Sequence, residues 1–193
     1  MINLPGGQAF APEYLLKGST LLALVFISTL VFLTIGPRKE WPFARKVVYL
    51  LFLIYLGCTF SLTLFPINIF TPSNAIHNLP FGMQTNVVNL SPLAWAKYDL
   101  LQSVGNILLL VPLGFLLPIL SQRFSSLGKI TFTGLLLSLT IESTQLAMNF
   151  FYLGNRIFDM SDLFLNTAGC IIGWFSFYCI SRLFPNEIQQ IQL

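Results

Sequence analysis

The chain has 193 residues, long enough for one domain, but hydrophobic residues make up 55% of it and charged residues only 9%. Soluble domains carry about 25% charged residues. This chain has too few charged side chains to cover the surface of a soluble globular domain. The aromatic content of 15% excludes a disordered chain, and three cysteines argue against a disulfide scaffold. A net charge of +3, with scattered basic residues, excludes a nucleic-acid partner. The composition predicts an all-α integral membrane protein.

Five apolar stretches have the length that a membrane-spanning helix requires, about 20 residues. They run over residues 18–35, 47–65, 101–120, 130–148 and 163–184. The one long connection, residues 66–100, is rich in Pro, Asn and Ser, as loops are. We therefore expect five transmembrane helices in a single domain over residues 1–193.

The distribution of Lys and Arg predicts the orientation in the membrane, because cytoplasmic loops are enriched in them. If the helices alternate in direction, one side holds Arg38, Lys39, Arg45, Lys46, Arg123, Lys129 and Arg182, and the other side holds Lys17, Lys97 and Arg156. This asymmetry predicts that the N-terminus lies outside and the C-terminus in the cytoplasm. The long loop and the 149–162 connection then face outward.

Polar residues collect at one depth of the predicted bundle, although an ionisable group inside a membrane is costly. Helices three to five contribute Asn106, Glu142, Gln145, Asp162 and Asn166, with Arg156 and Asp159 just before the fifth helix. All seven belong near the outer leaflet in this topology. The cytoplasmic halves of the same helices are almost purely apolar.

Helical spacing places these polar residues on shared faces, because residues three or four apart are neighbours on a helix. Asp159, Asp162 and Asn166 have this spacing, and the same face continues through Gly169 and Gly173. Small residues at such spacing let two helix backbones approach closely. The polar face of the fifth helix is therefore expected to contact a neighbouring helix, and the cluster to form one pocket that opens outward.

Three interpretations of this cluster stay open. It is a structural clamp, with Arg156 paired to Glu142 or Asp159, or a recognition pocket for a polar headgroup, sugar or peptide of the cell envelope. In the third interpretation, the carboxylates hold Mg²⁺, Ca²⁺ or Mn²⁺, or act as general acid and base in a small membrane enzyme. Histidine, cysteine and P-loop motifs for other chemistry are not found in the sequence.

Five segments together resemble the VanZ-like membrane proteins. They are SLTLFP at 61–66, VNLSP at 88–92, VGNILLLVPLGF at 104–115, SLTIESTQ at 138–145 and RIFDMSDLFLNTAG at 156–169. The resemblance covers about residues 47–180, and the first helix matches less closely. Its motif residues here are Asn106, Glu142, Gln145, Arg156, Asp159, Asp162 and Asn166, the same residues that spacing and topology bring together.

The resemblance implies a bacterial plasma-membrane protein of a family named for resistance to the glycopeptide antibiotic teicoplanin. It implies no agreed reaction, substrate or cofactor. We expect a multi-pass protein whose outward-facing pocket binds, or alters access to, a cell-wall precursor or lipid-linked envelope component beside the membrane lipids. The alternatives are a small membrane enzyme acting on a lipid-linked substrate, with or without a divalent cation, and a structural or adaptor protein.

Overall fold

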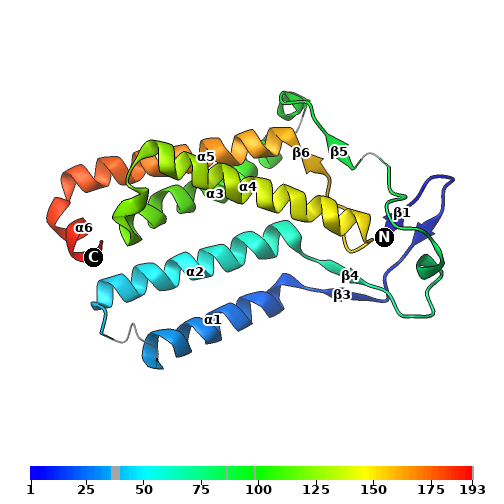
Figure 1. The fold of residues 1–193 in the computed structure, drawn as a ribbon, viewed down its shortest axis with the longest axis horizontal. Helices are drawn as coiled ribbons and strands as arrows, with labels where there is room; N and C mark the ends of the chain where they lie inside the picture. Colours follow the sequence, from blue (N-terminus) through cyan, green and yellow to red (C-terminus); the bar gives the residue numbers. More distant parts are fainter. Residues whose placement is uncertain (36–39, 86, 98, 193) are drawn as a thin grey trace.

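The computed structural model describes residues 1–35, 40–85, 87–97 and 99–192. It is mostly helical, at 68%. In Figure 1 the long helices run along the long axis of the molecule, the short strands gather at the end that carries the N-terminus, and the C-terminus lies at the opposite end. The helices are α1 (Gly18–Ile35), α2 (Phe43–Leu64), α3 (Leu100–Leu120), α4 (Leu127–Phe150), α5 (Met160–Leu183) and α6 (Pro185–Ile191).

The five predicted helices are all present, but several ends differ from the prediction. The helix α2 begins at Phe43 instead of residue 47, because it starts directly after Pro42 and continues through Arg45 and Lys46. Arg and Lys are good helix formers, so a helix can begin before its apolar stretch does. The short α6 was not predicted; it begins with Pro185, which is favourable in the first turn of a helix.

Among the described residues, three helices are long and apolar enough to cross a membrane: α2, α3 and α5. Over Gly18–Thr34, α1 is a shorter apolar helix. The 24 residues of α4 include Glu142 and Gln145, which lower its apolar character. The prediction of five spans therefore stays a prediction. Two of the cationic residues used for the orientation, Arg38 and Lys39, lie outside the described residues.

The helices α3 and α5 form the most extensive contact of the fold. A Cβ atom on Gly169 would lie 1.8 Å from the carbonyl oxygen of Ile107, and one on Gly173 would lie 2.0 Å from that of Val111. On the facing helix, a Cβ atom on Gly114 would lie 1.9 Å from the carbonyl oxygen of Cys170. The two backbones touch wherever these glycines stand, which confirms the close approach predicted for the fifth helix.

The core between α3, α4 and α5 is apolar from the middle of the bundle to the end away from the strands. Leu110, Leu113, Ile130 and Cys170 form one buried cluster there. The indole Nε1 of Trp174 donates to the carbonyl oxygen of Ser125 at 2.9 Å, which holds α5 against the link between α3 and α4. This apolar packing holds α3, α4 and α5 together, and so it positions the parts of these helices that carry the polar residues.

The strands at the other end are two or three residues long, too short to be predicted from the sequence. They are β1 (Ile2–Asn3), β2 (Ala9–Phe10), β3 (Tyr14–Leu16), β4 (Ile67–Ile69), β5 (Val88–Asn89) and β6 (Phe158–Asp159). The pairs β1–β2 and β3–β4 are antiparallel, and β5–β6 is parallel. Three short 3₁₀-helices complete the fold at Ala75–Asn78, Ala94–Lys97 and Gln122–Phe124.

The N-terminal segment packs on the long loop and forms a small core of its own. Ile2, Leu4, Ile76 and Tyr152 are buried together there. The carboxylate of Glu13 accepts hydrogen bonds from the Nδ2 atom of Asn74 at 2.7 Å and from the backbone N–H of Thr71 at 3.0 Å. These bonds, first that from Asn74, hold the pKa of Glu13 below its ordinary value. Residues 1–17 and 66–79 thus form one compact cap on the bundle.

Candidate functional site

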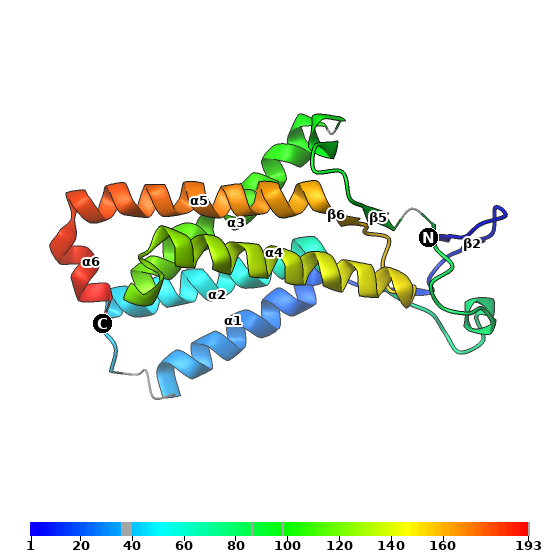
Figure 2. The same cartoon turned by 45° about the horizontal axis from the view of Figure 1, so that its top comes forward.

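A cavity of about 220 Å³ lies between α2, α3, α4 and α5, at the end of the bundle that carries the strands. Figure 2 shows the ends of α4 and α5 that meet β5 and β6 there. Six of the seven predicted site residues line it: Asn106, Glu142, Gln145, Arg156, Asp162 and Asn166. The other lining residues are Leu62, Thr63, Gly105, Leu109 and Ile141. The structure therefore brings together predicted site residues that are up to 60 positions apart in the sequence, from Asn106 to Asn166.

Two asparagines connect the walls of this polar cavity. The Nδ2 atom of Asn106 on α3 donates to Oδ1 of Asp162 on α5. The Nδ2 atom of Asn166 donates to the hydroxyl of Ser138 on α4 at 2.9 Å. Asn166 is only 2% exposed, and its Oδ1 atom is buried without a hydrogen-bond partner in the part of the chain that the structure describes. A buried polar atom without a partner costs about 1–3 kcal/mol, so this oxygen favours a ligand that donates to it.

The polar face of α4 is tied to both of its neighbours. Glu142 is 2% exposed, and its Oε2 atom accepts the backbone N–H of Asp159 at 2.9 Å. One turn later, Nε2 of Gln145 donates to the carbonyl oxygen of Thr63 at 2.9 Å. The carbonyl groups in the last turn of a helix lack intrahelical partners, and α2 ends at Leu64. Gln145 satisfies one of these groups, as the clamp interpretation expects of the amides.

Arg156 stands at the cavity as an exposed cation. Its guanidinium donates to the carbonyl oxygen of Leu62 at 3.3 Å, again in the last turn of α2. A guanidinium has five N–H donors in a fork that matches carboxylate and phosphate groups. The contact of Arg156 with the backbone of α2 uses one N–H of the guanidinium. Most of its donors are therefore left to face solvent or a ligand.

Asp159 is the one predicted site residue that does not line the cavity. It precedes α5 and caps it, because its Oδ1 atom accepts the backbone N–H of Ser161 at 2.8 Å. Its Oδ2 atom accepts the Nδ2 atom of Asn89 at 2.9 Å, where β5 pairs with β6. Helical spacing grouped Asp159 with Asp162 and Asn166, but an N-cap side chain folds back toward the first turn of its helix. Asp159 therefore attaches the long loop to α5.

The site also uses α2, from which the sequence predicts no site residue. Leu62 and Thr63 line the cavity, and their carbonyl oxygens accept from Arg156 and Gln145. A signal was available, because Pro66 ends the helix and leaves its last carbonyl groups open to side chains. Their partners could not be identified without the packing of α2 against α4.

The cavity combines two carboxylates, Glu142 and Asp162, with one guanidinium, that of Arg156. Among the described residues, no group of three or more His, Cys, Asp or Glu is placed to hold a metal ion. The arrangement offers hydrogen-bond acceptors inside and a cation beside them. Chemically, it can accept hydroxyl or ammonium donors and bind one anionic group.

Comparisons with known proteins bear on the resemblance found in the sequence. No curated protein and no solved structure gives a significant match to this chain. The model of the VanZ/LLP1 family matches residues 48–182, which is most of the chain and covers α2 to α5. The match includes every residue that lines the polar cavity. The chain therefore belongs to the VanZ/LLP1 family.

Proposed function

We propose that the protein spans the bacterial plasma membrane five times and binds a cell-wall or lipid-linked envelope component in its polar cavity. Through this binding it changes glycopeptide susceptibility, including that to teicoplanin. The N-terminus lies outside and the C-terminus in the cytoplasm, so that the cavity opens at the outer leaflet. The observation that carries the proposal is the buried, unpartnered Oδ1 atom of Asn166 in a cavity beside the exposed Arg156.

The placement of the cationic residues supports this orientation. Lys46 lies near the beginning of α2, Arg123 in the α3–α4 link, Lys129 in the first turn of α4 and Arg182 at the end of α5. These places lie at the end of the bundle with the C-terminus (Figure 1). The opposite end carries Lys17, Lys97 and Arg156. Because cytoplasmic ends are enriched in Lys and Arg, the strand-bearing end with the cavity is the outer one.

The polar groups define the chemistry of the ligand. Arg156 suits a phosphate or carboxylate, which it can hold with two parallel hydrogen bonds. Asp162, Glu142 and the free oxygen of Asn166 suit hydroxyl or ammonium donors. An envelope component with a hydroxylated or amine-bearing part next to an anionic group meets both requirements. A volume of about 220 Å³ admits one such head group and leaves an apolar anchor in the bilayer.

Substitution of Arg156 by glutamine tests the proposal. We expect the ligand affinity to fall about tenfold or more, because a hydrogen bond to a charged group contributes about 1.5–3 kcal/mol. The level and melting temperature of the protein should stay close to wild type, since Arg156 is exposed and bonded to one carbonyl group. The measurement is the teicoplanin susceptibility of a bacterial host that expresses each variant, compared with protein level and thermal melting.

The matched control is Arg123→Gln, which removes an exposed arginine at the opposite end of the bundle. This variant should keep the wild-type susceptibility. The proposal is contradicted if both variants act alike, or if the wild-type protein does not change susceptibility at all. A loss of folded Arg156→Gln protein would support the clamp interpretation instead.

A further inference from the structure

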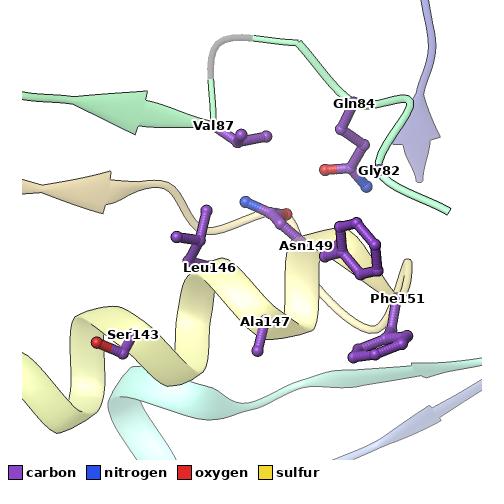
Figure 3. Close-up of a pocket in the computed structure, with 9 residues that line it drawn as sticks. Gly82, Gln84, Val87, Ser143, Leu146, Ala147, Asn149 and Phe151 are labelled. Atoms are coloured by element: carbon purple, nitrogen blue, oxygen red, sulfur yellow. The ribbon is translucent and has the colours of Figure 1, made fainter.

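A second cavity of about 430 Å³ lies between α4 and the loop before β5. Figure 3 shows Ser143, Leu146 and Ala147 of α4 on one side and Gly82, Gln84 and Val87 on the other. The loop is held there by the backbone N–H of Gly82, which donates to the carbonyl oxygen of Phe150 at 3.1 Å. Gly82 has a φ angle of +78°, which favours glycine, so this loop conformation depends on the residue type.

Two amide groups in this second cavity have buried atoms without hydrogen-bond partners among the described residues. They are Oδ1 of Asn149, which can only accept, and Nε2 of Gln84, which can only donate. Asn149 is 2% exposed. In Figure 3 both amide heads point into the space between α4 and the loop. An acceptor and a donor that face the same space match one group that can do both, such as a hydroxyl.

The second cavity is separate from the polar cavity and differs from it in character. The two share no lining residue, because Glu142 and Gln145 stand on one face of α4 while Ser143 and Leu146 stand on another. None of the described residues that line the second cavity carries a charged side chain. Apart from its amide and hydroxyl groups, it is lined by apolar side chains such as Val87 and Leu146. A charged head group would therefore lack a counter-charge, whereas a neutral amphiphile fits.

The surface beside the second cavity is apolar and suits entry from a bilayer. Phe81 is 59% exposed, and Phe150 and Phe151 are each 48% exposed. The rings of Phe81 and Phe151 lie edge to face with their centroids 5.2 Å apart. The rings of Phe150 and Phe151 do the same, with their centroids 5.1 Å apart. These side chains stand where α4 ends and the strand-bearing cap begins. An exposed apolar patch of this kind marks a lipid or ligand contact.

We propose that the second cavity binds the hydroxyl-bearing end of a neutral membrane lipid. The lipid hydroxyl donates to Oδ1 of Asn149 and accepts from Nε2 of Gln84, and its hydrocarbon chain lies against Val87, Leu146 and Ala147. The volume falls within the range of about 300–1,000 Å³ that is usual for small-molecule sites. This site is distinct from the polar cavity and does not depend on the function proposed for it.

Photo-crosslinking of the purified full-length chain tests this lipid site. The probe is a 1-decanol analogue with a diazirine on its alkyl chain, added to the protein in phosphatidylcholine vesicles. We expect the crosslink to map to residues 143–151. Unlabelled 1-decanol should compete about tenfold better than decyl methyl ether, which cannot donate, because the ether leaves the Asn149 oxygen without a partner.

Two variants separate specific binding from general lipid contact. Ala147→Phe places a ring in the second cavity from an exposed position, so the fold is retained and the crosslink should be lost. Its control, Leu139→Phe, lies on the same helix outside the cavity and should crosslink normally. Asn149→Leu should abolish the preference for decanol over the ether. Equal competition by the two compounds, or a crosslink that Ala147→Phe leaves unchanged, would overturn the proposal.

Discussion

Replacement of Gly169 by alanine is expected to force α3 and α5 apart and to remove most of the folded protein. The new Cβ atom would lie 1.8 Å from the carbonyl oxygen of Ile107, which is backbone and cannot rotate away. Overpacking of a core costs about 1–3 kcal/mol, and more where backbone must move. Asp162 and Asn166 stand on the same helix, so the polar cavity would lose its geometry as well.

Thermal melting of the detergent-solubilised protein measures this effect of the Gly169 substitution. The control is Gly128→Ala in the first turn of α4, where a Cβ atom meets nothing within 4 Å. The control should melt like wild type or slightly higher, since alanine favours a helix over glycine. A wild-type melting temperature for Gly169→Ala would show that the two helices are not in backbone contact.

The same Asp→Asn change is expected to act on function at residue 162 and on stability at residue 159. At Asp162, asparagine keeps an Oδ1 atom to accept from Asn106 and removes only the charge. Ligand affinity should therefore fall about tenfold or more at normal stability. At Asp159, asparagine places an NH₂ group against the Nδ2 donor of Asn89, inside a buried site. This change should cost about 1–3 kcal/mol of stability.

A comparison of melting temperature, membrane level and teicoplanin susceptibility separates the two Asp→Asn variants. Glu142→Gln is a third variant to compare, because glutamine still accepts the backbone N–H of Asp159 while the carboxylate charge is lost. It should behave like Asp162→Asn. If all three variants lost stability in step with resistance, the cluster would be a structural clamp and the ligand would have to bind elsewhere.

The polar cavity could be predicted from the sequence because a membrane makes polar residues costly. In a chain of mostly apolar helices, Asn106, Glu142 and Asp162 require hydrogen-bond partners. Because successive helices alternate in direction across the membrane, these residues lie at one depth. Gly169 and Gly173 identified the face of α5 that meets another helix. Both features follow from the helical spacing of the residues and from their depth in the membrane. They can be predicted without knowing how the helices pack.

Interactions with the backbone could not be predicted in the same way. Gln145 and Arg156 bind carbonyl groups of α2, which depends on how α2 lies against α4. Asp159 looked like a member of the helical stripe but caps α5, because one residue decides where that helix begins. The strands β3 and β4 pair over only three residues each, and the paired residues are more than 50 positions apart in the sequence. So short a pairing leaves no recognisable pattern in the sequence.

The proposed function requires that the polar cavity face the outside of the cell, and cysteine labelling measures this directly. Single cysteines at Asn155, beside Arg156, and at Gln122, in the α3–α4 link, are labelled in intact cells with a membrane-impermeant maleimide. Cys58 and Cys179 are first replaced by alanine, whereas Cys170 is 0% exposed and stays. We predict that Asn155→Cys is labelled in intact cells and Gln122→Cys only after permeabilisation. The reverse pattern would place the cavity in the cytoplasm and contradict the proposed function.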